Sequence, residues 1–329
     1  MPRSERSASP WFRNVLATLI AGGAFGISQV NLDPFVSGAD GGGTKKANAA
    51  APRTASVDLA VSTVNALPKV SGESDPAPDQ QQQVNDFQTL RGIWAIKMSQ
   101  ELLKKGCANF AKVSDYTAHM YKQERIGGVL SEGQAIDMKV RHEPFSVYMK
   151  WQTGDRGRQL IYVEGQNDGN MLVQPGGIKG RLTGLLNLEP TGSMAMSESR
   201  FPITKAGLLQ LGYTVMEYQD RDIARGSGFQ CELRDNQEFE SRPCYLYQIN
   251  YDSPQVHESY RKSLVFIDKE LSLPICVKNY TWAKDATPET IDDETLIEFY
   301  AYSELRVQQQ LGSVDFDQHN GDYKLRVRK

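Results

Sequence analysis

The chain has 329 residues, a formal net charge of −3 at pH 7 and a mean hydropathy of −0.48. A mildly acidic chain is a poor candidate for binding nucleic acid or anionic membranes through its charge, so we expect no nucleic-acid partner. The length could hold two domains, but the composition of the N-terminal quarter does not support a packed core there. We therefore predict one folded domain of ordinary size.

The N-terminus has the three parts of an export signal. Arg3, Arg6 and Arg13 precede an apolar run at 15–24, and small residues follow at a cleavage position. We predict that residues 1–26 are a signal peptide and that the protein is periplasmic or secreted. The run is shorter than the roughly 20 apolar residues of a spanning helix, so we expect no membrane span after cleavage. Cleavage would remove three arginines and one glutamate and change the formal charge from −3 to −5.

Residues 27–84 are rich in Gly, Ala, Ser, Pro and Gln. Such a segment has little apolar surface to offset the entropy lost on ordering, which predicts a disordered linker. The folded domain is expected at 85–329.

Two amphipathic helices are predicted. Asn85, with Gln88 three residues later, is placed to cap the first helix, and Gly106 suits its end. Thr204 is placed to cap the second helix, whose apolar stripe runs to Tyr218. Burying both stripes against a sheet is the ordinary use of such helices.

Short runs with a period of two fill most of the remaining chain, and their short connections predict antiparallel pairing. The Gly-punctuated segment 176–200 between two of these runs matches no phosphate-binding pattern and is predicted to be a mobile flap. The predicted strands are 116–125, 134–141, 145–152, 159–164, 171–174, 228–234, 245–251, 264–267, 275–282 and 295–307.

The chain has four cysteines, which allow three complete pairings in an oxidising compartment. Cys231 and Cys244 lie on consecutive predicted strands, so theirs is the pairing that we favour. The alternative is that all four are small buried apolar residues. No spacing typical of a zinc site occurs.

Catalytic motifs are missing from the sequence. The four histidines are scattered, without H-E-x-x-H, and no G-x-S-x-G is present. We therefore predict a protein that is not an enzyme and needs no cofactor or metal.

Several motifs stand out in the C-terminal three quarters of the chain. They are R-F-P-I-T-x-A-G (200–207), R-P-C (242–244), I-D-K-E-L-x-L-P-I (267–275), Y-T-W (280–282), V-D-F-D (314–317) and the run 158–173. Together they resemble an exported bacterial family known as domain of unknown function 1571. That family is in turn similar to the LolA/LolB lipoprotein-carrier superfamily. The resemblance implies an α+β fold, a curved antiparallel β half-barrel with helices covering its concave face, and a shape that shelters a hydrocarbon chain.

Bulky side chains alternate along several predicted strands, as the wall of a sheltered cavity requires. The alternative for each is a place in the core beneath the helices. Our main hypothesis is a non-catalytic envelope protein that binds a lipid or lipoprotein acyl chain. The second is a scaffold or interaction module for another envelope protein, and the third a hydrolase without a recognisable motif. The residues predicted to line the cavity are Val147, Met149, Trp151, Tyr162, Tyr245, Tyr247, Phe266 and Trp282.

Overall fold

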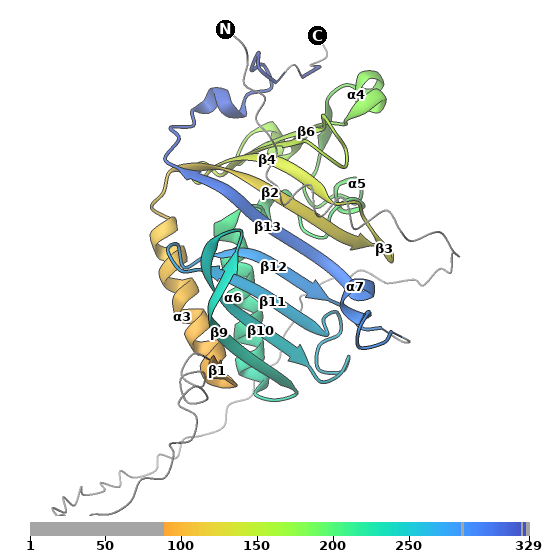
Figure 1. The fold of residues 1–329 in the computed structure, drawn as a ribbon. Helices are drawn as coiled ribbons and strands as arrows, with labels where there is room; N and C mark the ends of the chain where they lie inside the picture. The colour runs from red at the N-terminus through yellow and green to blue at the C-terminus, as the bar shows by residue number, and fades with distance from the viewer. Residues whose placement is uncertain (1–88, 284–285, 324, 327–329) are drawn as a thin grey trace, which may run out of the picture. The chain divides into compact units, whose positions relative to one another are not determined.

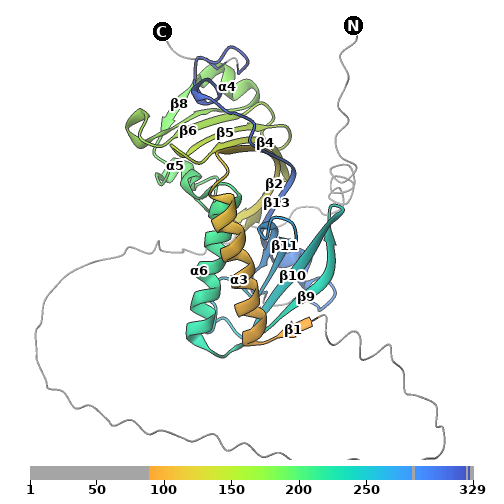
Figure 2. The same ribbon diagram turned by 90° about the vertical axis from the view of Figure 1, so that its left-hand side faces the viewer.

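A computed structural model describes residues 89–283, 286–323 and 325–326. The predicted signal peptide, the predicted linker and the proposed cap residue Asn85 lie outside this part of the chain. Its main elements form a curved, open antiparallel sheet with two long helices on the concave face, as predicted (Figures 1 and 2).

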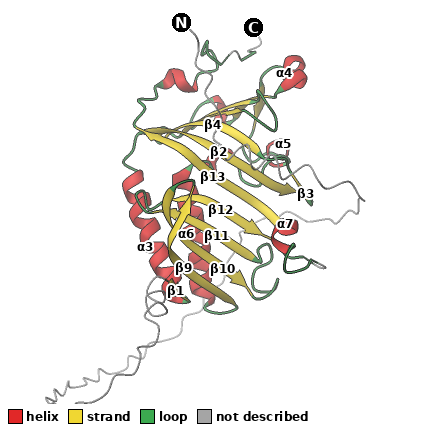
Figure 3. Ribbon diagram, in the orientation of Figure 1, coloured by secondary structure: helices red, strands yellow, loops and turns green. Residues whose placement is uncertain are grey.

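Thirteen strands of the described residues form the sheet, in the order β1-β9-β10-β11-β12-β13-β2-β4-β5-β6-β7-β8, with β3 paired to β2 (Figure 3). All neighbouring strands are antiparallel. Their bounds are β1 Thr89–Arg91, β2 Asp115–Ile126, β3 Val129–Leu130, β4 Gln134–Arg141, β5 Ser146–Trp151, β6 Gln159–Val163, β7 Met171–Gln174, β8 Leu186–Leu188, β9 Phe229–Phe239, β10 Arg242–Tyr251, β11 Lys262–Asp268, β12 Pro274–Tyr280 and β13 Leu296–Val307.

Strand β13 joins the two parts of the sheet, because it pairs with β12 along one edge and with β2 along the other. The β13–β2 register shifts between Ser303 and Arg306, and Glu304 there has a φ of 49°. An irregularity of this kind bends a strand and strengthens its twist, which contributes to the curvature of the sheet.

The two long helices are α3 (Ile93–Phe110) and α6 (Leu208–Arg225), and they lie side by side (Figure 2). Ala95, Ile96 and Leu103 of α3 and Val215 of α6 are buried in one cluster with side chains of β9 to β12. The shorter helices are α4 Gly177–Thr183, α5 Ser193–Met196, α7 Ile291–Thr295, η1 Asn167–Gly169, η2 Ile203–Lys205 and η3 Ser313–Phe316.

Several predicted boundaries were wrong. The first helix begins after Gly92, because Thr89–Arg91 pair with β9 instead of entering the helix. The second helix begins after Gly207. Thr204 lies in the preceding η2 turn and does not cap this helix. The predicted flap contains α4, β8 and α5, and β8 extends the sheet by pairing with β7.

A second apolar layer lies on the opposite face of β5 to β7. Phe316 and Tyr323 from the C-terminal segment pack there on Tyr148, Ile161 and Leu172. The rings of Tyr148 and Tyr323 are stacked, with centroids 3.9 Å apart. The sheet is therefore buried on both faces in this part, which explains why its strands read as almost continuously apolar.

The predicted disulfide between Cys231 and Cys244 is not formed, and all four cysteines are buried free thiols. Cys231 lies opposite Ile249 in the β9–β10 register, five residues along β10 from Cys244. At about 3.3 Å per residue, this separates the two cysteines by about 16 Å, beyond the roughly 7 Å limit of a bridge.

Gly106 does not end the first helix as predicted. It lies inside α3, where a Cβ atom would come within 2.0 Å of the Ser272 carbonyl oxygen in the β11–β12 turn. Only a glycine lets the helix approach this backbone so closely.

Replacing Gly106 with alanine should therefore destabilise the protein. Helix propensity alone would favour alanine by about 1 kcal/mol, but the collision with the Ser272 backbone should outweigh this gain and lower the free energy of unfolding by about 1–3 kcal/mol. Denaturant unfolding measures the change. The control is Gly312→Ala, because Gly312 has a φ of −92° and open space around it; equal stability of the two variants would contradict the packing described here.

Candidate functional site: a cavity beneath helix α6

A cavity of about 600 Å³ lies between α6 and the concave face of the sheet. Its wall is built by strands from both parts of the sheet, by one face of α6, and by the segment 195–206, which contains η2. The volume falls within the range of about 300–1,000 Å³ that is typical of small-molecule sites.

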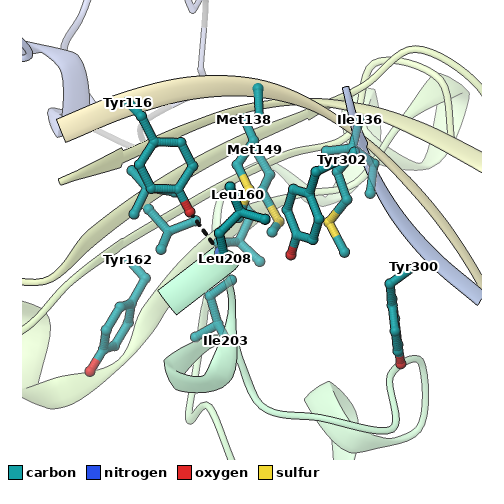
Figure 4. Packing of buried hydrophobic residues seen from close by; sticks show 14 of the residues in the cluster. Tyr116, Ile136, Met138, Met149, Leu160, Tyr162, Ile203, Leu208, Tyr300 and Tyr302 are labelled. Atoms are coloured by element: carbon teal, nitrogen blue, oxygen red, sulfur yellow. Dashed lines mark hydrogen bonds between the residues drawn. The ribbon is translucent and has the colours of Figure 1, made fainter. Parts of the chain in front are cut away.

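One side of the cavity is apolar. Ile136, Met149 and Leu160 stand on three neighbouring strands and project toward Ile203 of η2 (Figure 4). This side is anchored to α6, because the Leu208 backbone N–H donates a hydrogen bond of 2.9 Å to Tyr116 Oη. The other apolar lining residues of this side are Met120, Trp151, Met171, Ala195 and Phe201.

The other side is rich in tyrosines and polar groups from β10 to β13 and α6. The tyrosines of this side are Tyr218, Tyr247, Tyr251, Tyr260, Tyr300 and Tyr302. Tyr300 lies at the far end of the group from Tyr162, as seen in Figure 4. The same side also carries apolar side chains, among them Ile249, Val265 and Val277, so the cavity has a mainly apolar wall and a mixed wall, which we call the polar wall.

Three of the eight residues predicted to line a cavity do so, namely Met149, Trp151 and Tyr247. Val147 and Tyr162 lie in the neighbouring hydrophobic core, with 0% and 7% of their surface exposed. Both are therefore core residues, which was the alternative considered for them, and they do not line the cavity.

The remaining three predicted residues lie elsewhere. Phe266 is on the opposite face of β11 from Val265, which lines the cavity, and its ring packs on Phe239. Tyr245 is half-buried under the ammonium group of Lys269. Trp282 follows β12, and its Nε1 donates a hydrogen bond of 2.8 Å to a backbone carbonyl.

The polar wall contains a pair of buried carboxylates that the sequence did not reveal. Glu124 of β2 and Glu298 of β13 are directly opposite each other in the β2–β13 register, and each is 1% exposed. Like charges placed opposite each other on neighbouring strands are destabilising, so the structure needs nearby cations and hydrogen-bond donors.

Arg200 supplies the central cation. Its Nε forms an ion pair of 2.5 Å with Glu298, and its backbone N–H donates to Glu124 over 3.3 Å. Glu298 also accepts hydrogen bonds from Tyr260 Oη at 2.9 Å and from Asn279 Nδ2 at 2.6 Å. Every oxygen of this carboxylate is thus engaged by groups of the protein itself.

Glu124 is compensated in the same way. Lys122 Nζ lies 3.0 Å from its carboxylate, and Tyr300 Oη donates a hydrogen bond to it. Burial, followed by the nearby carboxylates, raises the pKa of the Tyr300 hydroxyl well above its usual value, so it remains protonated and donates. Lys122 Nζ also donates to Ser199 Oγ over 2.9 Å, which attaches the residue preceding Arg200 to the sheet.

A second polar group surrounds Asp222 of α6, which is 2% exposed. Its carboxylate accepts hydrogen bonds from Tyr251 Oη at 2.8 Å and from Arg225 Nη1 at 2.7 Å. Burial raises the pKa of Asp222. The nearby His257 ring stacks on Tyr260, and burial together with Arg225 lowers its pKa to about 4, so the imidazole is neutral at pH 7.

These groups do not form a recognisable catalytic or metal centre. Within the described ranges, no cluster of three or more His, Cys, Asp or Glu side chains is placed to hold a metal ion. The buried carboxylates are bonded to arginine, lysine and tyrosine side chains rather than poised beside a nucleophile. None of the helices described is long and apolar enough to cross a membrane.

An open antiparallel half-barrel with an amphipathic, helix-covered cavity is the class of protein that these features define. Residues 113–325 match the family model described as protein of unknown function, DUF1571. The chain belongs to this family, which confirms the family inferred from the sequence motifs. No curated protein matches the chain.

Several solved structures are similar to the chain. A putative outer membrane lipoprotein-sorting protein domain from Vibrio parahaemolyticus has 12% identity and a TM-score of 0.32, over 68% of this chain and 97% of that chain. The lipoprotein LppX from Mycobacterium tuberculosis has 10% identity and a TM-score of 0.39, over 67% and 99%. A LolA superfamily protein from Nitrosomonas europaea has 10% identity and a TM-score of 0.19, over 67% and 97%.

Removing the Arg200 charge should destabilise the fold through the carboxylate that it leaves behind. We expect Arg200→Met to lower the free energy of unfolding by about 3–5 kcal/mol, because Glu298 would then be buried without its cation. Adding Glu298→Gln to this variant should recover part of the loss, which a double-mutant cycle measures by denaturant unfolding.

The control is Arg91→Met, since Arg91 lies 4.0 Å from Glu232 and is 69% exposed. Exposed pairs of this kind contribute about 0–1 kcal/mol. Two outcomes would contradict this account of the Arg200–Glu298 pair. One is that Arg200→Met lowers the free energy of unfolding no more than Arg91→Met does. The other is that the effects of the substitutions at 200 and 298 on this free energy are additive.

Proposed function

We propose that this protein is an exported cell-envelope protein that binds a lipid or a lipoprotein acyl chain, without catalysis, in the cavity beneath α6. The observation that carries the proposal is the cavity of about 600 Å³ with one apolar wall. The export signal in the sequence supports a periplasmic or secreted location.

The energetics favour an acyl chain as the occupant of the apolar wall. Each buried methylene contributes about 0.8 kcal/mol, so about ten methylenes would contribute about 8 kcal/mol before the entropy of binding is subtracted. The gross energy corresponds to a micromolar dissociation constant. Burial of the apolar chain therefore supplies the main favourable energy against the cost of association.

The polar wall supports a binding role more than a catalytic one. Glu124 and Glu298 are occupied by donors of the protein, and Asp222 is paired with Tyr251 and Arg225. A general acid or base must exchange its proton with a substrate within hydrogen-bond reach. These carboxylates are engaged in holding the cavity wall together.

Native mass spectrometry of the full-length protein, purified from envelope extracts without detergent exchange, tests the proposal. We expect mass increments that correspond to bound lipid, and uptake of a fluorescent fatty acid by the delipidated protein. Reproducible absence of both signals would overturn the proposal.

A cavity-filling variant tests where the ligand binds. Thr214 is half-buried on α6 and lines the cavity, so Thr214→Trp should fill part of the space and lower fatty-acid affinity at least tenfold. Tyr213→Trp is the matched control, because Tyr213 is exposed on the same helix and lies outside the wall of the cavity. Equal affinities of the two variants, both folded by circular dichroism, would place the ligand elsewhere.

A further inference from the structure

Three methionines line the cavity, each on a different strand of the apolar wall. They are Met120 of β2, Met149 of β5 and Met171 of β7. Their surfaces remain 6%, 6% and 5% accessible, whereas Met138 in the same core cluster is 1% exposed and lies outside the cavity lining. The three lining methionines therefore border space that a ligand can fill.

The strand register continues this methionine surface across the sheet. Met120 lies directly opposite Ile136, and Met149 lies directly opposite Leu160. All four residues line the cavity, and they come from the adjacent strands β2, β4, β5 and β6. Figure 4 shows Met149 grouped with Ile136 and Leu160. A hydrocarbon chain on this surface would contact methionine side chains along its length.

The apolar residues of the polar wall are of a different kind. Ile249, Val265 and Val277 of β10 to β12 are all branched at Cβ. Branching at Cβ restricts the χ1 rotamers of a side chain, whereas methionine is unbranched, has three rotatable bonds and fills irregular gaps. The methionine surface can therefore change its shape more readily than the apolar part of the polar wall.

This difference in flexibility determines which chains the cavity can distinguish. A buried methylene contributes about the same energy, about 0.8 kcal/mol, in a straight chain and in a bent one. A cavity therefore distinguishes chains of equal carbon number mainly by steric misfit, because extra bulk forces rigid side chains away from their preferred rotamers. Methionine side chains avoid this penalty by adopting another rotamer.

We infer that Met120, Met149 and Met171 are specificity-determining residues that let the cavity accept acyl chains of different shape. The chains are straight and saturated, kinked by a cis double bond, or branched by a methyl group. The inference rests on the proposed lipid binding and adds the class of acyl chain that the cavity takes.

The test compares palmitic, palmitoleic and isopalmitic acid, which have equal numbers of carbon atoms and differ in shape. Each acid competes with a fluorescent fatty acid for the delipidated, full-length protein. We expect the three dissociation constants to agree within about threefold, because the flexible wall follows each chain.

A matched set of variants tests the role of the methionines. Isoleucine has a similar volume but is branched at Cβ, so the triple variant Met120→Ile, Met149→Ile and Met171→Ile keeps the space and removes the flexibility. It should weaken binding of palmitoleic and isopalmitic acid about five- to tenfold relative to palmitic acid. Met149→Ile alone should act in the same direction and replaces the triple variant if circular dichroism shows that the latter is unfolded.

The control is Met138→Ile, because Met138 lies directly opposite Met149 on β4 but outside the cavity lining. We expect this variant to leave the ratios of the three dissociation constants unchanged. An equal change of the ratios in the control and in the lining variants would overturn the inference.

Two further results would overturn the inference while lipid binding stands. One is a tenfold or larger preference of the unmodified protein for one of the three acids. The other is an unchanged ratio in the folded lining variants, which would mean that spare volume admits the different chains. If none of the acids bound at all, the proposed function itself would fail.

Discussion

The buried charges at the seam between β2 and β13 are the constraint on which the cavity depends. Glu124 and Glu298 face each other where the two parts of the sheet meet. Arg200, far away in sequence on the segment leading into η2, pairs with Glu298 through its side chain and donates its backbone N–H to Glu124, whose cation is Lys122. If that segment left the sheet, Glu298 would lose its cation, so the contact that neutralises Glu298 also fixes one wall of the cavity. Buried ion pairs are often no more stabilising than apolar residues of the same size. What this cluster supplies is a defined position for the segment.

The sequence motifs of the family have two roles in the structure: some shape the β11–β12 turn, and one contributes to the cavity wall. Arg242 of the R-P-C motif forms an ion pair with Asp268, whose other oxygen accepts hydrogen bonds from the backbone N–H groups of Glu270 and Leu271 at 2.9 and 2.8 Å. These contacts shape the β11–β12 turn, so the R-P-C and I-D-K-E-L-x-L-P-I motifs support one another in the fold. The R-F-P-I-T-x-A-G motif differs, because it begins with Arg200 and contributes Phe201 and Ile203 to the cavity wall.

Most strands could be predicted from the sequence because their period-two pattern is local and their turns are short. The sequence could not show which face of each strand lines the cavity. Both faces of β11 and β12 contact apolar clusters, with Val265 and Val277 on the cavity side and Phe266 on the other. A strand that is buried on both faces carries no alternation that shows which face is concave. Phe266 was therefore assigned to the wrong side, whereas Met149 and Trp151 were assigned to the face that lines the cavity.

The polar contacts of the cavity were beyond sequence analysis for a different reason. Glu124 and Glu298 are 174 positions apart, and neither belongs to a catalytic or metal-binding pattern; only the β2–β13 register brings them together. Tyr247 was predicted to line the cavity, but the sequence could not show that its hydroxyl is buried without a hydrogen-bond partner in the described part of the chain. The polarity of the cavity follows from this arrangement. Strands β4 to β7 supply mainly apolar side chains, whereas β10 to β13 with α6 supply the tyrosines and carboxylates together with apolar side chains such as Val265 and Val277.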